Sequence, residues 1–144
     1  MLPSKQSRLK WRSPTQSDYA SKIRRAVDNA IGLIEKILTA KENEQEAVKR
    51  ILWHAAEETE YAAALLSLAQ GFTDLDPRLE SDLKRMTTRG KLSQAKAFLQ
   101  EGLPLLEDNG ELCYVKLRYA VQALRSAQVA SSRRKRASAR LEDE

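Results

Sequence analysis

Hydrophobic residues recur along much of this chain at intervals of three and four, the spacing that places them on one face of an α-helix. The first such stretch opens with Ser13-Pro14-Thr15-Gln16, which has the form of a helix-capping box, and runs to about Ala40. The second starts near Asn43 and ends at Gly71, since glycine commonly terminates helices. The expected inward residues are Ile23, Val27, Ala30, Ile31, Ile34, Ile37 and Leu38 in the first helix and Val48, Ile51, Leu52, Ala55, Ala62, Leu65, Leu66 and Ala69 in the second.

Shorter helical patterns follow Gly71. Asp76-Pro77 combines a capping residue with a proline that fits the first helical turn, and it predicts a short helix that ends near Gly90. A second short helix is expected over residues 92–100. The turn signal Asn109-Gly110 then precedes a long helix that should end near Ala130. The expected inward residues are Leu79, Leu83 and Met86, then Ala95, Phe98 and Leu99, and finally Leu112, Val115, Leu117, Tyr119, Ala120, Ala123, Leu124 and Ala127.

These patterns predict an all-α fold, a compact four- to five-helix bundle with flexible basic termini. We expect the bundle to span residues 14–130, between a basic N-terminal arm at 1–13 and a disordered charged tail at 131–144. The single cysteine, Cys113, excludes an intrachain disulfide and indicates a buried thiol in a cytoplasmic protein. No apolar run is long enough for a membrane span, so no membrane partner is expected.

The net charge of +5 is concentrated at the two ends of the chain, since residues 1–13 carry +4 and residues 131–144 carry +2. The remainder carries −1, so a nucleic-acid surface on the bundle requires a local gathering of cations. The best candidate is the basic run over residues 84–96, because no acid interrupts the chain between Asp82 and Glu101. Such a run can follow successive phosphates, and the alternative is a solvated basic face without a ligand.

We therefore predict a phosphate-binding site built from this run, two cations of the first helix and the N-terminal arm. In the arm, Trp11 stands between Lys10 and Arg12, where an indole can stack on an unpaired base, or else it packs on the bundle. The segment Arg133-Arg134-Lys135-Arg136 is either a nonspecific phosphate binder or a solubilising tail. The predicted site residues are Lys10, Trp11, Arg12, Lys22, Arg25, Lys84, Arg85, Arg89, Lys91 and Lys96.

An acidic stretch opens the second helix. Residues 42–60 have a charge balance of −4, with only Lys49 and Arg50 opposing the glutamates. This stretch can dock a basic partner, and together with the basic run it allows head-to-tail stacking of identical subunits. The alternative is compensation of the helix dipole. The glutamates are Glu42, Glu44, Glu46, Glu57, Glu58 and Glu60.

No catalytic constellation is recognisable, so we expect a protein that is not an enzyme and has no catalytic residues, metal or cofactor. His54 with Glu57 and Glu58 superficially resembles a metal or acid-base site, but it is the only histidine, and a structural or surface role is favoured. Arg50 and His54 also resemble the Arg-x(4 to 6)-His signature of HEPN ribonucleases, with one intervening residue too few. A ribonuclease is therefore kept as an alternative.

Two later stretches carry a resemblance to a known family. Ala97-Phe98-Leu99-Gln100-Glu101-Gly102-Leu103 and residues 112–124 are similar to the short helix, turn and aromatic-bearing last helix of small subunits of CRISPR effector ribonucleoproteins, which act in antiviral defence. The resemblance implies a noncatalytic subunit that contacts the RNA or DNA backbone of guide, target or displaced strand through exposed Lys and Arg. It also implies other subunits, and copies of the same chain, as partners. The competing class is a helical protein-interaction adaptor, in which the alanine-rich face of the second helix receives a partner helix.

Overall fold

The computed structural model describes the backbone of residues 14–72, 77–78 and 83–143, and it describes side chains within residues 18–41, 43–72, 77–78 and 83–130. In this part of the chain the backbone forms helices and turns but no strand, which confirms the all-α prediction. The α-helices are α2 (Pro14–Leu38), α3 (Gln45–Gln70), α4 (Thr88–Gly102), α5 (Leu105–Asp108) and α6 (Gly110–Asp143), and the 3-10 helices are η1 (Glu42–Glu44) and η2 (Leu83–Arg85).

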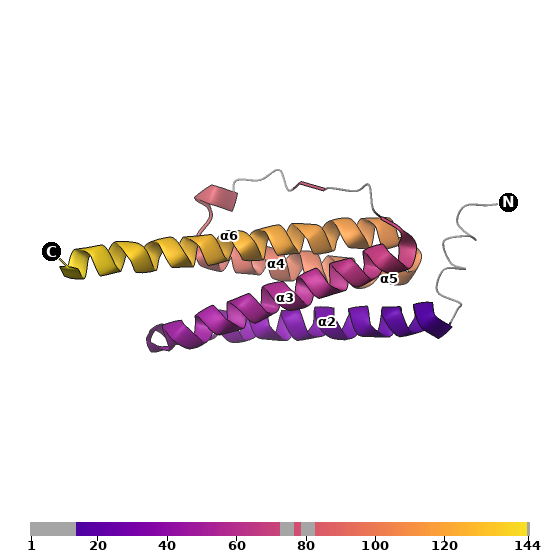
Figure 1. Cartoon of the computed structure of the whole chain (residues 1–144), viewed down its shortest axis with the longest axis horizontal. Helices are drawn as coiled ribbons and strands as arrows, with labels where there is room; N and C mark the ends of the chain where they lie inside the picture. The colour runs from indigo at the N-terminus through magenta and orange to yellow at the C-terminus, as the bar shows by residue number, and fades with distance from the viewer. Residues whose placement is uncertain (1–13, 73–76, 79–82, 144) are drawn as a thin grey trace.

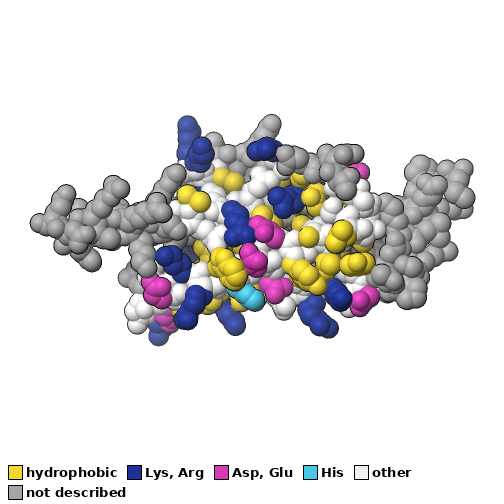
Figure 2. All heavy atoms as spheres, in the orientation of Figure 1, with side chains coloured by type: hydrophobic (Ala, Val, Ile, Leu, Met, Phe, Trp, Pro, Cys, Tyr) yellow, Lys and Arg dark blue, Asp and Glu magenta, His cyan; other side chains and the backbone are white. Residues whose placement is uncertain are grey.

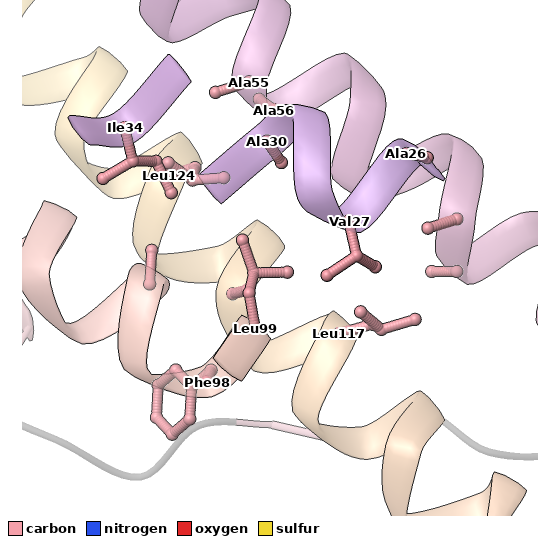
Figure 3. Close-up of a cluster of buried hydrophobic side chains, with 14 of the residues drawn as sticks. Ala26, Val27, Ala30, Ile34, Ala55, Ala56, Phe98, Leu99, Leu117 and Leu124 are labelled. Atoms are coloured by element: carbon pink, nitrogen blue, oxygen red, sulfur yellow. The ribbon is translucent and has the colours of Figure 1, made fainter. Parts of the chain in front are cut away.

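Four of these helices pack around one core (Figure 1). α2 and α3 form an antiparallel pair, α6 packs against both α3 and α4, and α4 also contacts α2. Each helix contributes an apolar stripe, and removal of these stripes from water supplies the main driving force for folding. Figure 3 shows the stripes meeting between the helices, with Ala26, Val27, Ala30 and Ile34 from α2, Ala55 and Ala56 from α3, Phe98 and Leu99 from α4, and Leu117 and Leu124 from α6.

The buried stripe of α6 differs from the prediction at its start. Leu112 is 40% exposed, so its predicted inward position is wrong, whereas the next residue, Cys113, is buried in the core. Leu112 is one residue out of phase with the buried stripe, because neighbours in a helix are rotated by about 100° from each other. The buried positions follow at three- and four-residue spacing and include Cys113, Leu117, Ala120, Leu124 and Ala127.

The start of α4 also differs from the prediction. Of the helix expected over residues 77–90, the described part contains only the 3-10 turn η2 and the first residues of α4, so this prediction is wrong. The reason is the side chain of Thr87, whose Oγ1 accepts a hydrogen bond from the backbone N–H of Gly90 at 3.0 Å. This cap satisfies a free amide at a helix N-terminus and sets the start of α4 at Thr88. Gly90 therefore lies inside a helix instead of ending one.

α6 is longer than its hydrophobic pattern predicts. It continues to Asp143, so the expected end near Ala130 is wrong, and residues 131–143 have a helical backbone where we expected a disordered tail. Arg, Lys, Ala, Leu and Glu make up most of this segment, and their intrinsic helix propensity is high even without an apolar stripe. α6 thus extends past the ends of the neighbouring helices (Figure 1).

Some predicted features lie outside the described residues. They include the N-terminal arm with Lys10, Trp11 and Arg12, the inward position of Leu79, and every side chain of residues 131–144. Among the helices that the structure describes, none has both the length and the apolar composition that a membrane crossing requires.

Candidate nucleic-acid interface

Three exposed cations lie where η2 leads into α4, and we call this group the basic end: Lys84, Arg85 and Arg89. Within the described residues, Lys84 and Arg85 make no hydrogen bond or ion pair. Arg89 donates a hydrogen bond from Nη1 to the backbone oxygen of Leu38 at 2.9 Å, which ties it to the last turn of α2. A carbonyl carries no net charge, so all three cations remain without a carboxylate partner in the described part of the chain.

The surroundings of the basic end add to its positive potential. The first turn of α4 contains no acidic residue, so the positive end of its helix dipole is not offset there. η2 contacts α6, and α6 continues beyond the bundle at this same end of the molecule (Figure 1). The sequence of that continuation includes Arg133-Arg134-Lys135-Arg136. In Figure 2, Lys and Arg side chains stand out at the upper left, where η2 lies in Figure 1.

Two members of the predicted basic run do not belong to this surface. Lys91 is only 4% exposed and its Nζ donates to the backbone oxygen of Ser126 at 3.5 Å, so its predicted phosphate contact is wrong. Lys96 is partly buried, and its Nζ lies 3.3 Å from the Oε1 of Glu35 on α2. The run is free of acids along the chain but not in space, because α2 brings a carboxylate to it.

The two predicted cations of α2 are also separate from the basic end. Lys22 forms an ion pair with Asp18 at 3.3 Å, one helical turn away. Arg25 is exposed and has no ion pair among the described residues. Both lie at least thirteen residues before Leu38, the α2 residue that Arg89 contacts, which is about 20 Å along the helix. The structure therefore does not bring them together with the basic end.

The acidic stretch is not a free docking surface at its C-terminal part. Arg125 of α6 lies 2.7 Å from Glu60 and 3.2 Å from Glu57, and Glu58 lies 3.6 Å from His54. Burial lowers the pKa of Arg125, but its hydrogen bonds to Glu60 and Glu57 and the negative charges of these two glutamates together raise the pKa by more, so the net shift is upward. Glu57 and Glu60 thus link α3 to α6, and Glu58 is paired within α3. The predicted head-to-tail stacking therefore loses half of the six glutamates of its acidic surface.

An exposed tryptophan, Trp53, lies outside every predicted site. Trp53 is 56% exposed and lines a shallow, open hollow of about 480 Å³ with Leu33, Arg50, Ile51 and His54. Leu33 comes from α2 and the others come from α3. The sequence does contain a signal for the exposure of Trp53, namely its position in the helical period. Trp53 falls between the positions of α3 that are buried, Leu52, Ala55, Ala56 and Thr59.

Other chemical groups of the described chain offer no obvious reaction centre. No group of three or more His, Cys, Asp or Glu side chains gathers there in a way that suits a metal ion. Cys113 is buried, as predicted, and burial raises the pKa of its thiol to about 12, so the nucleophilic thiolate is suppressed at neutral pH. Arg50 and His54, the pair that resembles the signature of HEPN ribonucleases, both line the hollow beside Trp53. Ribonuclease activity of this protein stays a prediction.

Comparisons of this chain with family models, with curated proteins and with solved structures found no match. The function therefore has to be inferred from the site itself.

Proposed function

We propose that this protein is a noncatalytic nucleic-acid-binding subunit that holds a phosphate backbone with its basic end. One observation carries the proposal: Lys84, Arg85 and Arg89 are exposed without carboxylate partners in the described chain, at the end where α6 continues into an arginine-rich segment. Contacts between cations and phosphates supply affinity and orientation but carry little information about base identity. Membership of a larger ribonucleoprotein, as in the CRISPR small subunits that the sequence resembles, remains a prediction.

Charge reversal of the basic end tests this proposal. The variant Lys84→Glu, Arg85→Glu, Arg89→Glu should bind a fluorescently labelled single strand more weakly than the wild type. If all three cations contact phosphates, the plot of log affinity against log salt concentration should become shallower by about two, because each contact to a single strand contributes about 0.7. Fluorescence anisotropy at several salt concentrations measures both quantities.

A matched triple variant on α2 provides the control. Lys22→Glu, Arg24→Glu, Arg25→Glu changes the net charge by the same amount through exposed cations in the first half of α2, at least thirteen residues before Leu38, the residue that Arg89 contacts. It should retain most of the affinity and most of the salt dependence. An equal loss of affinity in the two triple variants would show that binding depends on net charge alone and would overturn the basic end as the site. Unchanged affinity in the variant of the basic end would overturn it as well.

A protein-interaction adaptor is the second candidate. It is favoured by Tyr61 and Leu68, which are 49% and 74% exposed on the outer side of α3. The face predicted for this role is wrong in most of its residues, because Ala55, Ala56, Ala62 and Ala63 are buried in the chain's own core and only Ala64 of the five alanines is exposed. The adaptor would be supported if a co-purified protein binds with an affinity that does not depend on salt concentration and if Leu68→Asp abolishes this binding.

A further inference from the structure

Trp53 is exposed to solvent and is not part of the bundle's hydrophobic core. It is 56% exposed, and the hollow beside it has a volume of about 480 Å³. Ligand clefts in proteins commonly span about 300–1,000 Å³, so the hollow is large enough for a small planar group. Leu33 and Ile51 supply an aliphatic wall, and Arg50 and His54 add polar groups. Such a lining suits a flat ring that carries a charged substituent.

One side of this hollow, at Arg50, favours an anion. Arg50 is exposed and has no ion pair within the described residues. Two glutamates that follow Trp53 along α3 are engaged by other side chains, Glu57 by Arg125 at 3.2 Å and Glu58 by His54 at 3.6 Å. Figure 2 shows the histidine among hydrophobic and acidic side chains, with Lys and Arg side chains nearby. A negatively charged group is therefore best accommodated on the side of Arg50.

We infer that the hollow binds an unpaired base of a single-stranded nucleic acid, with the base stacked on Trp53 and an adjacent phosphate at Arg50. Aromatic side chains next to cations hold single strands in this way with little sequence preference, because every base has a π-face. Paired bases in a duplex are already stacked on one another and are not free to enter the hollow. This inference rests on the proposed function and adds to it the class of strand.

A single-tryptophan variant makes the site visible. The chain contains two tryptophans, Trp11 and Trp53, so Trp11→Phe leaves only the indole of the hollow. Titration with oligothymidylate should quench the fluorescence of Trp53 to saturation, and a matched duplex should quench it far less. Trp53→Ala should weaken single-strand binding by roughly tenfold and leave duplex binding nearly unchanged. The exposed position of Trp53 leaves the core intact in this variant, which a thermal melt verifies.

Two further variants separate this site from nonspecific effects. Arg50→Gln should weaken single-strand binding and make its salt dependence shallower by about 0.7, the contribution of one phosphate. Tyr61→Ala removes another exposed aromatic side chain of α3, outside the lining of the hollow, and should retain the wild-type affinity. An equal loss in Tyr61→Ala and Trp53→Ala would overturn the hollow as the binding site.

The outcomes also distinguish this inference from the proposed function. If the wild type binds neither single strand nor duplex, both are wrong. If it binds single strands while the fluorescence of Trp53 and the affinity of Trp53→Ala stay unchanged, only the hollow is wrong. Self-association of the protein without nucleic acid, lost in Trp53→Ala, would identify a second copy as the occupant and overturn the base-stacking site.

Discussion

At the scale of single residues, Gly110 and Gln70 are in close contact. Gly110 opens α6, and a Cβ atom at this position would overlap the side-chain amide of Gln70 at the end of α3. Gln70 is only 8% exposed, so its amide has little room to move aside. Sequence analysis interpreted Asn109-Gly110 as a turn signal, but the contact adds a second reason for glycine.

Gly110→Ala should therefore lower the free energy of unfolding, by about 1–3 kcal/mol, the usual range for an overpacked core site. Gly32→Ala is the control, because nothing lies within 4 Å of a Cβ at this position in the middle of α2. It should raise the free energy of unfolding by about 0.5–1 kcal/mol, since alanine favours helix. Urea denaturation of the two variants measures whether each substitution lowers or raises the free energy of unfolding. Equal stability of Gly110→Ala and the wild type would show that the Gln70 amide moves freely.

At the scale of elements, α3 and α6 are joined by a charged cluster as well as by the core. Arg125 bonds Glu60 through Nε at 2.9 Å and Glu57 through Nη2 at 3.2 Å. All three side chains are between 36% and 46% exposed, so water and salt screen the attraction. The cluster sets how the two helices align and contributes only modestly to the free energy of unfolding.

Arg125→Met should lower the free energy of unfolding by about 1 kcal/mol or less, because it leaves two carboxylates near each other on α3. The loss should shrink at high salt, where the repulsion between Glu57 and Glu60 is screened. Adding Glu57→Gln to this variant should restore part of the stability. Denaturant melts of the single and double variants at two salt concentrations measure the coupling. A loss that is independent of salt would instead indicate that the aliphatic part of Arg125 provides the stabilisation.

At the scale of the whole molecule, the sequence was sufficient to predict the helical bundle but not to predict which charged side chains are free on its surface. The periodic burial of Ile23, Val27 and Ile34 is a local property of one helix, and the structure confirms it. Whether a cation predicted on the surface is exposed, buried or paired with a carboxylate depends on which neighbouring helix faces it. Lys96 meets a carboxylate from α2, and Lys91 is covered by α6, and neither partner is near in sequence.

The missed features have the same origin. Trp53 follows the buried Leu52, and only the three-dimensional arrangement shows that its indole stays exposed beside the helices that the structure describes. The length of α6 was missed for the opposite reason. Its last residues lack an apolar stripe, so periodicity gives no signal there, although their intrinsic helix propensity is high. Periodicity therefore predicts buried faces, and it is silent about helices and side chains that the core does not use.

The part of α6 beyond the bundle should contribute to binding and not to folding. The last core residue that α6 supplies in the described chain is Ala127, so a chain truncated after Ala130 keeps the observed core. Its thermal midpoint should change by less than about 2 °C, which for a domain of this size corresponds to roughly 0.5 kcal/mol. The truncation removes five cations and three acids, so affinity for single strands should fall and depend less on salt.

A full-length variant separates charge from helix length. Replacing Arg133, Arg134, Lys135, Arg136 and Arg140 by glutamine removes the cations and retains good helix formers. If the segment acts through phosphate contacts, this variant should lose at least as much affinity as the truncated chain, because it lacks the same five cations and keeps the three acids. Its helix content by circular dichroism should stay at the wild-type level. A truncated chain that melts many degrees lower yet binds as tightly as the wild type would instead make the end of α6 a structural element, and the interface would then reduce to Lys84, Arg85 and Arg89.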